Sequence, residues 1–129
     1  MARIGAIGAV VFALGILTIG SAAQAHHSTA AYDRNHKVLI EGTVRKFNWT
    51  NPHSWLYVEV PDEKGGTSSW ALECGSVASL INSGWTRDAV KEGSHVKIVA
   101  IISRDGTNRG EVQTLFNDDG KQLKNTIGY

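Results

Sequence analysis

The stretch FNWTNPHSWLYVEV, residues 47–60, decides the fold, because it runs from a turn into the clearest alternating pattern in the chain. Alternate side chains of a β-strand point to opposite faces. Proline fixes its own φ and restricts the residue before it, so Asn51-Pro52 places the start of the strand at His53. One face is apolar and comprises Leu56, Val58 and Val60, and the other is aromatic and able to bind ligands and comprises His53, Trp55, Tyr57 and Glu59.

Outward from this stretch, alternation predicts four more strands, over residues 38–47, 69–74, 95–103 and 111–116. In the strand over 95–103, the positions expected to face the core are Val96, Ile98, Ala100 and Ile102, and those expected opposite are His95, Lys97, Val99 and Ile101. A short helix is expected between the third and fourth strands, with Ser76 as its N-cap, Leu80 and Ile81 at helical spacing and Gly84 at its end.

Three strands, a helix and two strands follow the order of the oligonucleotide/oligosaccharide-binding (OB) barrel. The sequence therefore predicts an all-β domain with one short helix, a five-stranded OB-like Greek-key barrel over residues 38–129, preceded by an extended arm over 26–37. An open β-sandwich or meander with an inserted helix is the alternative. Large rings at Trp49 and Trp85 would close the ends of the barrel.

The first 25 residues have the pattern of a signal peptide. Arg3 is followed by an uncharged apolar run over residues 4–20 and by SAAQA, residues 21–25, whose small-x-small ending suits signal peptidase. The run holds three interior glycines, Gly5, Gly8 and Gly15, and is shorter than the roughly 20 residues that span a bilayer. We expect cleavage after Ala25, a periplasmic product and no stable membrane anchor after cleavage.

Charge and cysteine content limit the partners. Without Arg3 the expected mature chain has 12 Lys and Arg against 12 Asp and Glu, and it contains no basic run. Binding to phosphate backbones requires a local surplus of cations, so we expect no nucleic-acid partner. The single cysteine, Cys74, has no partner for an internal disulfide and is expected to be a buried core residue.

Several motifs together resemble a bacterial family of small exported proteins, a family of unknown function numbered 6152. These motifs are HHS at 26–28, YD at 32–33, GTV at 42–44, WTNPH at 49–53, WALE at 70–73 and GWTRD at 84–88. The resemblance covers essentially all of the expected mature chain. It implies a periplasmic single-domain β protein without an assigned activity, and it supplies no catalytic residues.

A first candidate site consists of His26, His27 and His53. Cleavage after Ala25 would give His26 a free α-amine beside its imidazole, and another imidazole would complete a set of three nitrogens suited to tetragonal Cu(II). This predicts a copper-like divalent ion as the possible cofactor. The alternative is that His26 and His27 belong to a free arm and that His53 bonds Asn51 or the backbone in a turn.

A second candidate is the polar face with Trp55, Tyr57 and Glu59. Barrels of this class bind ligands by stacking on such faces, and neutral charge favours a saccharide, peptide or partner protein. The alternative is a barrel rim covered by the N-terminal arm, with Tyr32 folded back on Trp55.

A third candidate is a carboxylate pair, Glu59 and Glu73, on adjacent expected strands. Such pairs divide acid and base roles in hydrolases, whereas exposed glutamates balanced by Arg45 and Lys97 are the ordinary interpretation. No nucleophile motif or phosphate loop is present in the sequence. The sequence thus predicts a non-enzymatic binding or accessory module.

Overall fold

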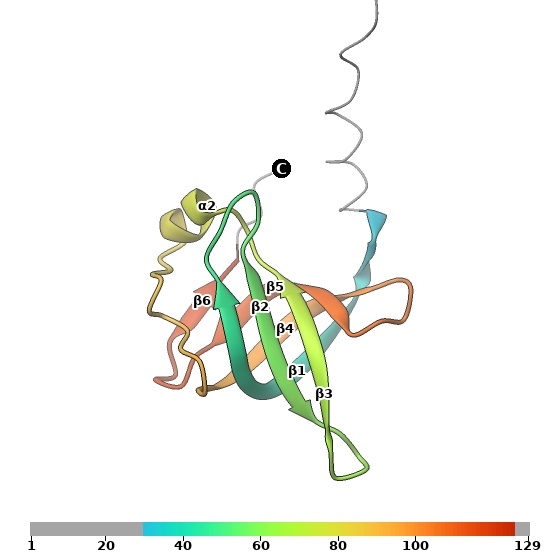
Figure 1. Cartoon of the computed structure of the whole chain (residues 1–129). Helices are drawn as coiled ribbons and strands as arrows, with labels where there is room; N and C mark the ends of the chain where they lie inside the picture. Colours follow the sequence, from blue (N-terminus) through green and yellow to red (C-terminus); the bar gives the residue numbers. More distant parts are fainter. Residues whose placement is uncertain (1–29, 126–129) are drawn as a thin grey trace, which may run out of the picture.

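The computed structural model describes residues 30–125. The expected signal peptide, its cleavage site, and His26 and His27 lie outside the described residues. The chain forms six strands and one helix in the described range (Figure 1). In chain order these are β1 (Tyr32–Asn48), β2 (Trp55–Pro61), β3 (Thr67–Glu73), α2 (Val77–Asn82), β4 (His95–Ser103), β5 (Arg109–Phe116) and β6 (Gln122–Lys124).

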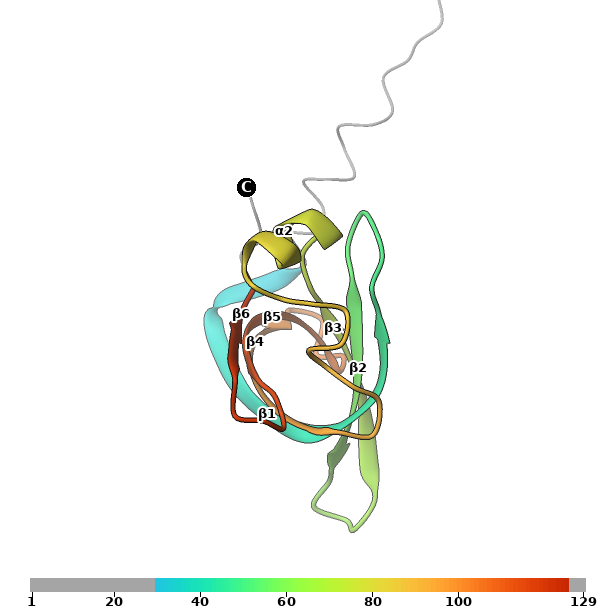
Figure 2. The same cartoon turned by 90° about the vertical axis from the view of Figure 1, so that its left-hand side faces the viewer.

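The strands form one sheet with the order β3-β2-β1-β4-β5-β6. A further, parallel pairing joins β3 to β5, with Leu72 opposite Gly110. Every other pairing is antiparallel. The β3–β5 pairing closes strands β1 to β5 into a ring, which Figure 2 shows in cross-section. The predicted five-stranded OB-like barrel is therefore confirmed, and the open sandwich or meander is excluded.

The core fills the inside of this ring. Its largest side chain is Trp85, which is 1% exposed and donates its indole N–H to the carbonyl oxygen of Lys124 at 2.8 Å. Trp85 and the partly buried Trp49 both lie near Phe47, with ring centroids 6.0 and 5.7 Å away, respectively. The other buried core residues are Ile40, Val44, Leu56, Val58, Leu72, Cys74, Leu80, Val90, Val96, Ile98, Ala100, Val112, Leu115 and Leu123.

Strand β1 is long enough to serve two neighbours. Its first part pairs with β4 and its last part with β2, and the two pairings meet at Thr43. Gly42 lies beside this junction, where an added Cβ would overlap the carbonyl oxygen of Glu59. Only glycine allows the two backbones to approach so closely. The strand can thus bend from one side of the barrel to the other.

Helix α2 follows its sequence signals. The Ser76 side chain accepts a hydrogen bond from the Ser79 amide at 3.2 Å, and Gly84 has a φ of 85° just after the helix. The Asn51 side chain accepts a further bond from the Val77 amide at 3.0 Å. These bonds satisfy amides that the first helical turn leaves unpaired. They also fix the turn that precedes β2 against the helix.

The structure corrects several boundaries and faces. Strand β1 begins at Tyr32, so residues 32–37, expected within an arm, belong to the sheet. Strand β2 begins at Trp55 and not at His53, and residues 122–124 add an unexpected sixth strand. In β4, Ile101 is buried and Ile102 is partly exposed, the reverse of the expectation.

The reversal in β4 follows a register shift against β5 between Val99 and Ala100, which alternation in one strand cannot reveal. In the helix, Leu80 is buried, whereas Ile81, the other apolar residue expected at helical spacing, is 56% exposed. None of the helices within residues 30–125 has the length and apolar character needed to cross a membrane.

Candidate functional site

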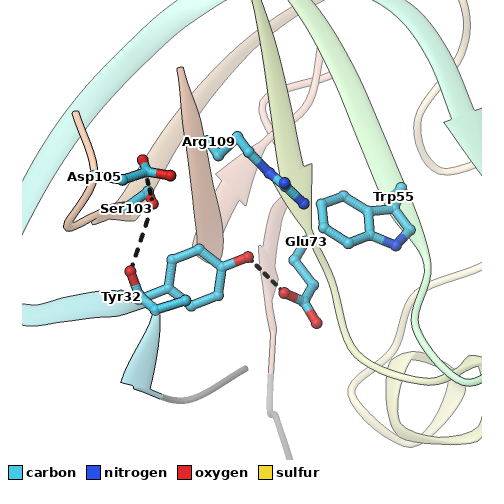
Figure 3. Close-up of a pocket in the computed structure, with 7 residues that line it drawn as sticks. Tyr32, Trp55, Glu73, Ser103, Asp105 and Arg109 are labelled. Atoms are coloured by element: carbon cyan, nitrogen blue, oxygen red, sulfur yellow. Dashed lines mark hydrogen bonds between the residues drawn. The ribbon is translucent and has the colours of Figure 1, made fainter. Parts of the chain in front are cut away.

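A pocket of about 250 Å³ opens where the start of β1, the start of β2, the end of β3 and the β4–β5 loop meet (Figure 3). We call it the Trp55 pocket. Ligand sites of OB barrels characteristically involve the loop between strands 1 and 2 and the loop between strands 4 and 5. Here these loops supply His53 beside the pocket and Asp105 on its wall. The pocket is lined by Ala31, Tyr32, Trp55, Glu73, Ser103, Asp105 and Arg109.

Glu73 is the buried acid of this pocket. It is the last residue of β3, and its side chain is 8% exposed. The Tyr32 hydroxyl donates to Oε2 at 2.6 Å, and Nδ1 of His53 contacts Oε1. A buried carboxylate needs such partners, because desolvation without compensation is costly. Three residues distant in the sequence are thereby joined through one carboxylate.

Tyr32 reaches Glu73 because β1 starts earlier than alternation suggests. The backbone pairs Tyr32 with Ser103 of β4, and the Tyr32 side chain is 5% exposed. Burial, followed by the hydrogen bond and the negative charge of Glu73, raises the pKa of Tyr32 well above its ordinary value. The phenol therefore remains protonated and acts as a hydrogen-bond donor to the carboxylate.

His53 lies just before β2, and backbone bonds hold this approach to the strand. The Ser54 amide donates to the Gly75 carbonyl at 3.0 Å, and the Cys74 amide donates to the Ser54 carbonyl at 2.8 Å. The His53 side chain is 38% exposed. Its ring partner is Glu73, and not Asn51 or the backbone as the turn interpretation expected; Asn51 instead binds helix α2.

Trp55 faces Glu73 directly across the β2–β3 ladder. The Arg109 guanidinium lies over the indole ring, 5.4 Å from its centroid. Such a stack is stabilised by the attraction between a cation and the negative face of the ring. Arg109 is the first residue of β5, so the strand that closes the barrel also brings this cation to the pocket.

Asp105 forms the opposite wall and organises the β4–β5 loop. Its Oδ1 atom accepts bonds from the Ser103 hydroxyl at 2.8 Å, the Thr107 amide at 2.9 Å and the Thr107 hydroxyl at 2.6 Å. These bonds, those from Thr107 first, lower the pKa of Asp105 to about 2. Asp105 is therefore a fixed, ionised carboxylate under ordinary conditions.

A second buried carboxylate lies behind the pocket. Glu111 of β5 is the ladder partner of Glu73 in the parallel β3–β5 pairing and is 4% exposed. Burial raises the pKa of Glu111, the charge of Glu73 raises it further, and Arg34, Gln113 and His53 oppose the rise. The Gln113 amide donates to Glu111 Oε1 at 2.9 Å.

This raised pKa predicts a pH dependence of stability. The native state holds the Glu111 proton more tightly than the unfolded state, so this group's contribution falls as pH rises from its ordinary pKa through the raised one. Glu111→Gln cannot ionise. The free energy of unfolding of this variant relative to the parent should increase between pH 4 and pH 8, as measured by urea unfolding at several pH values. A difference that is constant or decreases with pH would contradict the assignment.

Of the predicted ligand face with Trp55, Tyr57 and Glu59, only one residue lines the Trp55 pocket. Trp55 lines the pocket, whereas Tyr57 and Glu59 follow it along β2 and are partly exposed. Glu59 accepts a hydrogen bond from the Ser69 hydroxyl at 2.6 Å and lies 4.0 Å from Arg45. The hydrogen bonds from Ser69 and Thr67 lower the pKa of Glu59. Tyr32 and Trp55 both line the pocket, but Tyr32 belongs to β1 and its hydroxyl binds Glu73, so the segment that the covered-rim alternative treated as an arm is part of the sheet.

The proposed carboxylate pair is not formed. Glu59 stands opposite Ser69, whereas Glu73 stands opposite Trp55. Glu73 is also buried, contrary to the interpretation that it is an exposed residue balanced by lysine or arginine. Lys97 instead lies 3.6 Å from Glu41. The antiparallel register of β2 with β3 determines the positions of Glu59 and Glu73, and strand alternation alone does not predict that register.

Of the three histidines predicted to bind a metal, the structure describes His53, whereas His26 and His27 lie outside the described residues. Within residues 30–125 no three His, Cys, Asp or Glu side chains are arranged to hold a metal ion. His95 contacts Glu41 at 3.1 Å, far along the chain from His53. An ion held by three such side chains, His53 among them, would therefore need a ligand from outside the described range, where His26 and His27 lie. Cys74 is fully buried, as expected, and burial raises the pKa of its thiol.

Sequence reasoning missed Ser103, Asp105 and Arg109. These residues lie at the ends of β4 and β5 and in the turn between them, where no periodic pattern marks a functional side chain. The available signal was indirect: once an OB barrel is predicted, the loop between its fourth and fifth strands is a place to search for ligand contacts.

The barrel topology and the pocket between its loops define an OB-type β-barrel over residues 30–125. The chain belongs to the Family of unknown function (DUF6152), whose model matches residues 13–113. This chain is similar in structure to the mitochondrial single-stranded DNA-binding protein Rim1 from S. cerevisiae, with a TM-score of 0.48 and 15% sequence identity. The match covers 70% of this chain and 96% of the Rim1 chain. No curated protein matches the chain.

Proposed function

We propose that this protein is an exported, periplasmic and non-enzymatic binding module that holds a copper-like divalent ion at His53. The expected mature N-terminus would complete the site with the imidazoles of His26 and His27 and with the α-amine of His26. The observation that supports this proposal best is the contact between Nδ1 of His53 and the buried carboxylate of Glu73.

This contact prepares an imidazole for a metal. A carboxylate accepts hydrogen bonds and does not donate them, so Nδ1 of His53 must carry the proton that faces Glu73. The lone pair then resides on Nε2. Metal-binding histidines usually have this arrangement, in which a carboxylate fixes the ring and raises its basicity. The ring is 38% exposed and is therefore open to an ion from solvent.

Chain connectivity also favours the proposal. Tyr32 and His53 bind the same carboxylate, so β1 starts beside the imidazole. Tyr32 follows His27 by five positions, and an extended chain over that interval reaches at most about 18 Å. The tether is thus long enough to bring an N-terminal imidazole to His53 and short enough to keep it in the neighbourhood.

Titration with Cu(II) tests the proposal. Protein beginning at His26 should bind one Cu(II) more tightly than protein with one extra residue before His26, because that residue removes the amine from the chelate. His53→Gln should also weaken binding, by about tenfold or more. His95→Gln is the matched control, since it removes another imidazole that contacts a carboxylate. Equal affinity in all four proteins would contradict the proposal.

A second candidate function is the binding of a saccharide, peptide or partner protein on the face that contains Trp55 and Tyr57. The Trp55 pocket favours it, because an aromatic ring and several polar groups converge on one cavity. The zero formal charge of the expected mature chain still predicts no nucleic-acid partner. A flat tryptophan fluorescence response across glycans and periplasmic extract would count against this candidate.

A further inference from the structure

We propose that the Trp55 pocket binds a small zwitterion, a free α-amino acid, with its carboxylate on Arg109 and its ammonium group on Asp105. The inference rests on the second candidate function in that it uses the same pocket as a ligand site, but it names a free amino acid in place of a saccharide, peptide or partner protein. It is independent of an ion at His53. Three features carry it: an available cation, an available anion facing the same cavity, and the size of the cavity.

Arg109 supplies the cation. Its guanidinium is stacked on Trp55, and within residues 30–125 it makes no ion pair with a carboxylate. A guanidinium has five N–H donors in a planar fork that matches a carboxylate. Stacking holds the fork in place without using these donors. Figure 3 shows the Arg109 side chain extended over the pocket toward Trp55.

Asp105 supplies the anion. The three hydrogen bonds that position it all end on Oδ1, from Ser103 and Thr107. Its Oδ2 accepts no hydrogen bond from the described part of the chain. The carboxylate is thus held rigidly while one oxygen remains available to a donor. An ammonium group offers such donors together with the opposite charge.

Size and charge agree with a free amino acid. A volume of about 250 Å³ lies below the roughly 300–1,000 Å³ of pockets for drug-sized ligands, which suits a smaller ligand. The charges of Arg109 and Asp105 cancel formally, so a neutral ligand with two separated charges complements them. Each oxygen of Glu73 already has a protein partner, in Tyr32 and His53. Arg109 and Asp105 are therefore the groups left for the ligand.

The test compares three probes of nearly equal shape by NMR titration of the full-length ¹⁵N-labelled protein. L-Alanine has both charges, L-lactate replaces the ammonium with a hydroxyl, and L-alanine methyl ester lacks the carboxylate. L-Alanine should shift the Trp55 indole N–H signal, assigned with Trp55→Phe. Each of the other two should bind about tenfold more weakly or worse, because each loses one charge-assisted contact. L-Leucine and L-glutamate would show whether a longer side chain is needed.

Variants assign each contact to its residue. Arg109→Gln should lower the affinity for L-alanine by about tenfold and leave the affinity for the methyl ester unchanged. Asp105→Asn should lower the affinity for L-alanine and leave the affinity for L-lactate unchanged. Arg104→Gln is the control, since it removes an exposed arginine of the same loop that does not line the pocket. Thermal unfolding would verify that each variant is folded.

Two results would overturn the inference. In the first, no amino acid shifts the Trp55 signal at about 10 mM, a concentration that detects millimolar affinity. In the second, D-glucose shifts it and the amino acids do not, which would retain the pocket as a ligand site but reject the zwitterion. A Cu(II) titration that fails at His53 would leave the amino-acid result unaffected, so the two proposals can fail separately.

Discussion

Replacing Leu72 by alanine should lower the free energy of unfolding by about 2–5 kcal/mol, the usual effect of truncating a fully buried leucine. Leu72 is 0% exposed and pairs with Leu56 on one side and with Gly110 on the other. It therefore lies where β3 and β5 close the barrel. Truncation leaves a cavity that strands on both sides of the closure would have to fill. Urea unfolding followed by tryptophan fluorescence measures the change.

Leu39→Ala provides the matched control, because Leu39 is also a strand leucine but is 67% exposed. The control should change the free energy of unfolding by less than about 0.5 kcal/mol. Similar losses in the two variants would contradict the closed barrel, since they would mean that the β3–β5 junction does not bury Leu72. If the urea midpoint of Leu72→Ala is lower than that of the parent, and the free energy of unfolding falls with urea concentration at the same slope, only stability has changed.

Replacing Glu73 by glutamine should lower the affinity for Cu(II) by about 10–100-fold, the range found when the hydrogen-bonded partner of a metal-binding histidine is removed. Glutamine can donate a hydrogen bond to Nδ1 of His53, which favours the tautomer with the proton on Nε2. That proton blocks the atom proposed to bind the ion. The Tyr32 hydroxyl can still donate to the amide oxygen, so the fold should be retained.

Glu41→Gln is the control for Glu73→Gln, since Glu41 also contacts an imidazole, that of His95, on an exposed face. Competition with a copper chelator of known affinity would measure both variants. Glu41→Gln should bind Cu(II) with the same affinity as the parent. An unchanged affinity in Glu73→Gln, or an equal loss in both variants, would show that the buried carboxylate does not prepare His53 for a metal.

Local patterns predicted those parts of the fold that depend on one element at a time. Leu56 and Val58 alternate with partly exposed neighbours in β2, and β4 has the predicted bounds His95–Ser103. Ser76 caps helix α2 and Gly84 follows its end, as expected. In each case the physical cause is contained within a few consecutive residues.

The site depended on pairings between distant residues. Tyr32 and Glu73 are 41 positions apart, and the parallel register of β3 with β5 sets Glu73 beside Glu111. A one-residue change of register would turn these side chains to other neighbours. Glu73 and His53 were singled out from the sequence, but as members of different candidate sites. The antiparallel register of β2 with β3, which sets Trp55 opposite Glu73, brings them into contact.

The most direct test of the central claim is the electron paramagnetic resonance spectrum of Cu(II) bound to protein beginning at His26. If His53 ligates the ion through Nε2, pulsed measurements should detect the remote nitrogen of its imidazole, and His53→Gln should lose that contribution whereas His95→Gln should keep it. A spectrum that is identical in the parent and His53→Gln would contradict the claim that the His53–Glu73 pair forms the metal site.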